Sequence, residues 1–113
     1  EFRRVLFRSV LDWASEEVVI PYRSPIDGKI HRYFPDFIVR FKNKDEQIET
    51  FLIEVKPASQ TREPQVRTRK TRKYLQEVMT WGANQAKWEA AEAYANNRGW
   101  KFKIFTEKEL GIR

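Results

Sequence analysis

Apolar and polar residues alternate along much of the first half of the chain, a pattern that is typical of strands with one buried face. It predicts three strands joined as an antiparallel meander, over residues 17–22, 30–41 and 50–56. Pro35 would interrupt or bend the second strand, because proline has no amide hydrogen to donate to the ladder. The third strand is the most apolar, so we expect it near the centre of the sheet. Residues 10–13 are predicted to end a preceding helix.

The second half of the chain changes to a helical spacing of apolar residues. It predicts two helices separated by a break at Trp81-Gly82, over residues 65–79 and from 83 or 84 to 97. A last strand over 100–106 and a short helical end over 107–110, capped by Thr106, follow. The order of elements indicates an α/β or α+β domain, in which the last strand returns beside the third and makes the central sheet mixed.

Three charged side chains interrupt the apolar pattern of the predicted sheet. Asp36 follows Pro35 directly, and Glu54 and Lys56 share one face at the end of the third strand. Burying such charges is costly unless a partner compensates them. A divalent cation would compensate both acids together, since it binds carboxylate oxygens. In the alternative interpretation, Asp36 and Lys56 form a structural salt bridge and no metal binds.

The composition limits the kind of metal and the class of protein. The 113 residues include no cysteine and one histidine, so a metal would be bound by oxygen, which favours Mg²⁺ or Mn²⁺. This length predicts a single domain. No apolar run approaches the ~18 residues of a membrane span, and no signal peptide is evident, so we expect no membrane and a cytoplasmic location.

Positive charge is concentrated in one segment. The chain carries a formal net charge of +6, and residues 62–73 hold six basic side chains against one acid: Arg62, Arg67, Arg69, Lys70, Arg72 and Lys73. We interpret this run as a surface that contacts phosphates, the alternative being a solvated helix face. Lys87 and Gln85 on the predicted second helix could also reach a phosphate or the acidic site, with the same alternative.

The first nine residues read EFRRVLFRS, and part of this segment resembles a translated sequencing adapter. We therefore interpret residues 1–9 as non-native and residues 10–113 as a single domain that has lost its N-terminus. The alternative is the start of a genuine amphipathic helix. Without these nine residues the net charge falls to +4, because they contain three bases and one acid.

The acids and the lysine also match a known signature. Pro35-Asp36, seventeen residues, and then Glu54-Val55-Lys56 resemble the motif of the PD-(D/E)XK nucleases. Longer stretches are similar to the head completion nucleases of tailed phages and, more distantly, to the endonuclease subunit of heteromeric transposases. These stretches are residues 15–22, 27–37, 53–57, 81, 84–88 and 105–107. The resemblance covers about residues 13–110.

The resemblance implies a restriction-endonuclease-like core and a Mg²⁺-dependent DNA endonuclease. It implies that the enzyme processes DNA ends, or acts in packaging and neck assembly with capsid proteins as partners. It implies a location in the host bacterial cytoplasm or in the virion. Asp36, Glu54 and Lys56 would be the catalytic set, and the Val55 carbonyl could add a metal ligand. Such enzymes usually carry another acid on a first helix, which has no counterpart here, so Glu16 is a candidate for additional metal contact.

Two other functions remain open at this point. A catalytically silent DNA-binding or virion structural module could retain the same fold, although it would not need all three charged residues. A basic RNA-binding domain would use the Arg67–Lys73 run and leave the acids unexplained. The sequence shows no element that reads bases, so we expect little sequence specificity.

Overall fold

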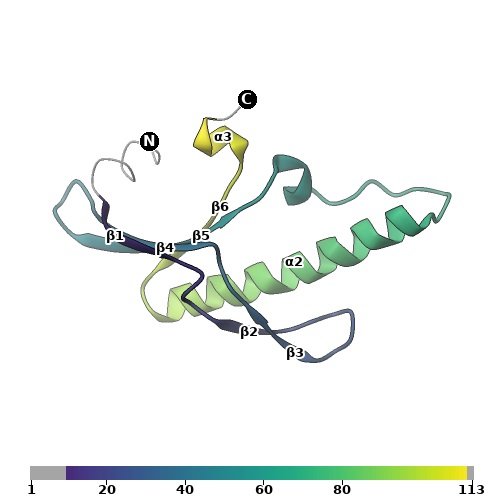
Figure 1. Cartoon of the computed structure of the whole chain (residues 1–113), viewed down its shortest axis with the longest axis horizontal. Helices are drawn as coiled ribbons and strands as arrows, with labels where there is room; N and C mark the ends of the chain where they lie inside the picture. The colour runs from purple at the N-terminus through teal and green to yellow at the C-terminus, as the bar shows by residue number, and fades with distance from the viewer. Residues whose placement is uncertain (1–9, 112–113) are drawn as a thin grey trace.

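The computed structural model describes residues 10–111, so the interpretation of residues 1–9 as an adapter lies outside the described residues. Figure 1 shows the order of the elements. They are β1 (Val10–Ser15), β2 (Ile20–Arg23), β3 (Ile30–Tyr33), β4 (Phe37–Lys42), β5 (Ile48–Val55), the 3₁₀ helix η1 (Ala58–Thr61), α2 (Arg72–Asn97), β6 (Lys101–Phe105) and α3 (Glu107–Leu110). Four strands form the main sheet in the order β1-β4-β5-β6, and β2 and β3 form a second sheet.

The α+β class and the mixed central sheet are confirmed. β4 pairs antiparallel with β5, while β6 returns parallel to β5 after the crossover through α2. The predicted meander, however, is divided between two sheets. Pro35 is fully buried where the chain leaves β3 and enters β4, and it cannot continue a ladder. The β2–β3 hairpin therefore diverges from the main sheet, as Figure 1 shows.

The prediction that residues 10–13 end a helix is wrong, because this segment belongs to strand β1 on the edge of the main sheet. It pairs antiparallel with β4, where Trp13 lies opposite Val39. Across this pair Arg40 donates to Asp12, and the Trp13 ring meets Phe37 edge to face. A short apolar run does not by itself distinguish helix from strand, and here the cross-strand pairs decide.

The predicted break at Trp81-Gly82 and the predicted start at residue 65 are wrong, because α2 is one continuous helix of 26 residues that starts at Arg72. The Thr71 hydroxyl accepts the Tyr74 amide and fixes this start. Residues 65–71 lack regular structure, and Val66 is 85% exposed, so a helix there would have no core to pack against. Gly82 remains helical, and a Cβ at this position would lie 3.8 Å from Pro25 Cγ.

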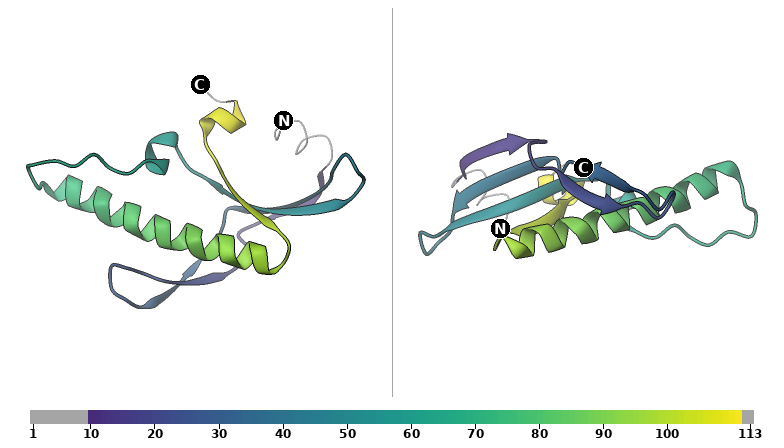
Figure 2. Two further views of the ribbon diagram at one scale, coloured as in Figure 1. Left: turned by 180° about the vertical axis from the view of Figure 1, so that it is seen from behind. Right: turned by 90° about the horizontal axis from the view of Figure 1, so that it is seen from below.

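The core has two parts, one on each face of the main sheet. On the face that α2 covers, Leu52 packs in one cluster with Ile20, Tyr33, Trp88, Ala91 and Ala95. On the opposite face lie Val39, Phe41, Phe51, Ile53 and Phe105, with Leu110 of α3 packed against them. The predicted cap of α3 is confirmed, because Thr106 and Glu109 form a capping box. Figure 2 shows α2 extending well beyond the sheet.

No helix within residues 10–111 is both long and apolar enough to cross a membrane.

Candidate active site

The three charged residues of the motif meet where β5 ends. Asp36 lies in the short connection between β3 and β4, and its Oδ2 accepts the Val55 amide at 2.7 Å. On the other side the Lys56 amide donates to the Phe105 carbonyl of β6 at 3.0 Å. The backbone of residues 55–56 is thus held on one side by the β3–β4 connection and on the other side by β6. The first of these contacts places the Asp36 carboxylate next to the Glu54-Val55-Lys56 segment.

Glu54 is a buried acid whose two oxygens face different partners. Its side chain is 8% exposed. Oε1 accepts the Tyr33 hydroxyl at 2.5 Å, and Oε2 lies 3.5 Å from the Lys56 ammonium nitrogen. Because Tyr33 belongs to β3, this hydrogen bond joins the second sheet to the end of the main sheet.

The electrostatics of this group favour a compensating cation. Burial raises the pKa of Glu54, and the nearby Asp36 charge raises it further, while Tyr33 and Lys56 act in the opposite direction. Burial and the Glu54 carboxylate also raise the pKa of Tyr33, so its hydroxyl stays a donor at neutral pH. Because two carboxylates lie beside only one lysine, a net negative charge remains where access of solvent is poor.

The donor set fits a hard divalent cation bound by oxygen. Asp36 and Glu54 offer carboxylates, and Val55, whose amide binds Asp36, follows Glu54 directly and adds a backbone carbonyl at the end of β5. Within residues 10–111 no group of three or more His, Cys, Asp or Glu side chains could hold a metal ion. Two carboxylates are therefore what the described chain offers, and a backbone carbonyl and water would complete the coordination.

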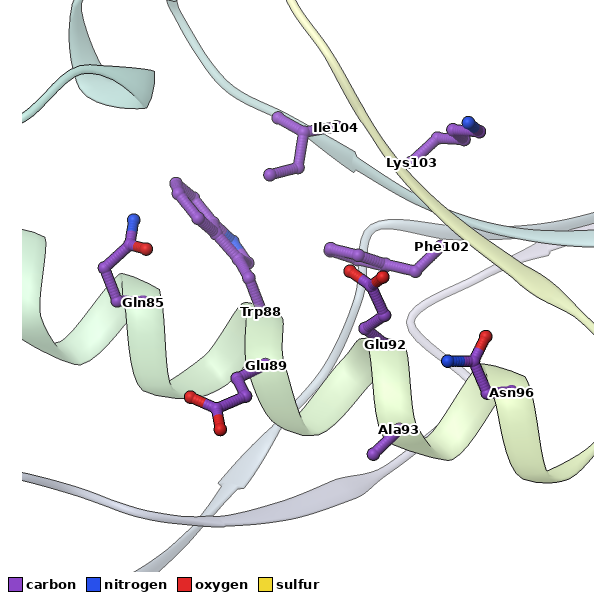
Figure 3. A pocket seen from close by; sticks show the side chains of 9 residues that line it. All are labelled: Gln85, Trp88, Glu89, Glu92, Ala93, Asn96, Phe102, Lys103 and Ile104. Carbon is purple, nitrogen blue, oxygen red and sulfur yellow. The ribbon is translucent and has the colours of Figure 1, made fainter.

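Glu16 and Gln85, the two additional candidates, lie in different surroundings from the motif residues. The Glu16 amide donates to the Asp36 carbonyl at 3.1 Å, with a left-handed φ of 53°, but its carboxylate does not join a three-acid group in the described chain. Gln85 is exposed and lines a cavity of about 630 Å³ between α2 and β6. Figure 3 shows it there beside Trp88, with Glu89 and Glu92 further along the helix.

The side chains of Lys87 and Tyr33 extend the site toward the β2–β3 hairpin. The Lys87 ammonium nitrogen lies 5.8 Å from the ring centre of Tyr22 and 5.9 Å from that of Tyr33. Tyr33 is not among the catalytic or metal-binding residues that the sequence predicts. Its place two residues before Pro35-Asp36 is a signal in hindsight, but the contact with Glu54 depends on β3 leaving the main sheet.

The basic segment is mostly an extended loop rather than a helix face. Residues 62–71 run beside the first half of α2, and Arg72 and Lys73 lie in its first turn (Figure 1). All six basic side chains are exposed. Lys70 contacts the Tyr74 ring at 5.0 Å, and the first turn of α2 contains no acid. Positive charge therefore gathers at a helix N-terminus, where it is intrinsically unfavourable and where anions are attracted.

Comparison with known proteins gives two matches. The family described as TnsA-like endonuclease N terminal matches residues 7–107 of this chain. The head completion nuclease of Enterobacteria phage T4 is 38% identical over an alignment of 105 positions, which covers 89% of this chain and 67% of that protein. No solved structure matches significantly.

Proposed function

The chain belongs to the TnsA-like endonuclease N-terminal family, of the PD-(D/E)XK type, and we propose that it is a metal-dependent DNA endonuclease with Asp36, Glu54 and Lys56 as its catalytic set. The observation that carries this proposal is the hydrogen bond from the Val55 amide to Asp36. It brings a second acid to Glu54 and Lys56 at the end of β5. Family membership alone would not require that these three side chains converge.

In this proposal each residue has a role that follows from its place. Asp36, Glu54 and the Val55 carbonyl would hold Mg²⁺ or Mn²⁺, which when bound polarises the phosphate and lowers the pKa of water. The Lys56 ammonium group, 3.5 Å from Glu54 Oε2, would orient the attacking water or stabilise charge on the phosphate. Tyr33 would hold Oε1 of Glu54 in place.

The exposed basic side chains would bind the DNA backbone. The loop over residues 62–71 and the first turn of α2 lead away from the end of β5, and Lys87 lies over the hairpin rings on the site side of α2. Contacts of this kind neutralise phosphates and carry no base information. We therefore expect binding that depends strongly on salt and weakly on sequence.

The relative in phage T4 suggests the biological setting. That protein is named for head completion, and its alignment covers 89% of this chain. We therefore place the proposed activity in processing of DNA ends during phage head completion, in the host cytoplasm or the virion, with capsid or neck proteins as partners.

A second candidate is a silent DNA-binding or virion module with the same fold. One observation favours it: within the described residues the acids at the site number two rather than three. Weak metal binding would leave DNA binding by the basic segment intact and remove cleavage.

The test is cleavage of plasmid and linear DNA in Mg²⁺ and in EDTA. We expect cleavage only with the metal, and a loss of about 100-fold or more in Glu54→Ala and Lys56→Ala, the size seen when a charge-stabilising group is removed from an active site. Glu89→Ala and Lys42→Ala, both exposed and outside the site, are matched controls that should cleave normally. DNA binding by the wild-type protein without cleavage in either Mg²⁺ or Mn²⁺ would support the silent module instead.

A further inference from the structure

A cavity of about 570 Å³ lies next to the proposed site, and the mechanism above leaves it unused. It opens between the segment that follows β5 and the first half of α2. The residues that matter for its chemistry are four carboxamides, an indole and a guanidinium: Gln60, Gln65, Gln76, Asn84, Trp81 and Arg62.

The topology places this cavity beside the acids. Gln60 is on η1, four residues after Lys56. Asn84 lies one helical turn before Trp88, which packs in the same cluster as Leu52. Because α2 connects two parallel strands, it runs opposite to β5, so a step back along α2 corresponds to a step from Leu52 toward Glu54. The cavity therefore adjoins the end of β5 where Asp36 and Glu54 meet.

Four of the eleven residues that line the cavity carry carboxamides. Each carboxamide both donates and accepts, as the edge of a nucleobase does. Asn84 is 5% exposed, and no hydrogen bond ties its side chain to another residue of the described chain. Its polar atoms therefore keep access to solvent through the cavity, where they can pair with a ligand.

The other side chains narrow the choice of ligand. Trp81 is partly buried against the core and offers an aromatic ring on which a base can stack. Arg62 could hold the phosphate attached to that base. Glu63 and Glu77 also line the cavity, and their carboxylates disfavour a bare phosphate inside it while accepting from exocyclic amino groups.

We infer that this cavity receives one unpaired nucleobase of the DNA, next to the phosphate that is cleaved. The inference rests on the proposed function and sharpens it: the substrate is DNA with a single-stranded nucleotide, such as an overhang or a frayed end, rather than intact duplex. A base inside a duplex would first have to unpair, which costs free energy, and a free end offers its base without that cost.

The test measures binding without metal, so that it does not depend on cleavage. A duplex with a three-nucleotide overhang is compared by fluorescence anisotropy with the same duplex carrying abasic sites in the overhang, for 5′ and 3′ overhangs. We expect the bases to tighten binding by about tenfold in at least one polarity, as one stacked base contributes. Asn84→Ala and Gln76→Ala should lose this preference, and Asn96→Ala, exposed on the same helix, should keep it.

Two results would overturn the inference: equal binding of the base-containing and abasic overhangs by the wild type, or an unchanged preference in both cavity variants. Gln76 is exposed, so its variant should fold even if Asn84→Ala does not, and thermal unfolding checks both. Cleavage of DNA without a preference for the base-containing overhang would contradict the proposed role of the cavity and support the nuclease activity. A preference for the base-containing overhang without cleavage would support the role of the cavity and contradict the nuclease activity.

Discussion

At the scale of single residues, Glu54 is where stability and proposed function oppose each other. A side chain that is 8% exposed, beside a second carboxylate, is held by one tyrosine hydroxyl and one lysine. Burial raises its pKa, which means that the fold resists its ionised form. Such a residue is retained at a cost to stability, as is common in functional sites.

Glu54→Gln is therefore expected to stabilise the metal-free protein at pH 7. Glutamine keeps an acceptor for Tyr33 and removes the charge. Because the pKa of Glu54 is raised on folding, the wild type loses stability as pH rises from 4.5, the ordinary value, through the raised value. Thermal unfolding in EDTA should therefore show a higher midpoint for Glu54→Gln than for the wild type at pH 7.

This gain should disappear below pH 4.5, where the glutamate is protonated in both the folded and the unfolded state. Glu89→Gln, exposed on α2, should show no such dependence on pH. A Glu54→Gln variant that is less stable than the wild type at pH 7 would mean that the Lys56 contact outweighs the cost of burial.

At the scale of elements, alternation along the sequence was enough to predict β4 and β5, and with β5 the face on which Glu54 lies. It could not show which strands share a sheet, because that depends on where Pro35 redirects the chain. The contact between Tyr33 and Glu54 could not be predicted for the same reason, since it forms across the two sheets.

The error over α2 has a different physical origin. Glycine costs about 1 kcal/mol in a helix interior relative to alanine, which favoured a break at Gly82. The helix continues because Trp81, Asn84 and Trp88 lie along a stripe that faces the core, and packing outweighs the local cost. Propensity alone does not contain that information.

Gly82→Ala tests the continuous helix. A Cβ at this position would lie 3.8 Å from Pro25 Cγ, an ordinary contact, so the gain in helix propensity should be realised. We expect the free energy of unfolding to rise by about 0.5–1 kcal/mol, measured by urea denaturation. Gly99→Ala is the matched control and should destabilise, because Gly99 has a φ of 72°. A destabilising Gly82→Ala would indicate a hinge at this position.

At the scale of the whole molecule, the proposed site lies where three parts of the fold converge. The second sheet contributes Tyr33, the link between the sheets contributes Asp36, and the end of β5 contributes Glu54 and Lys56. Beyond this point α2 and the basic loop extend past the sheet, in a molecule with extents of 53 × 34 × 19 Å (Figure 2). The proposed chemistry and the proposed DNA binding would thus occupy adjacent regions of one elongated surface.

We propose that Asp36 and Glu54 form one metal site, and calorimetric titration with Mn²⁺ measures binding at that site. The wild type should bind one ion. Asp36→Asn and Glu54→Gln, which keep the acceptors for Val55 and Tyr33, should each weaken binding by about tenfold or more, as the loss of a charged ligand contact implies. Lys56→Ala should still bind. Unchanged Mn²⁺ affinity in the double variant Asp36→Asn, Glu54→Gln would contradict the account.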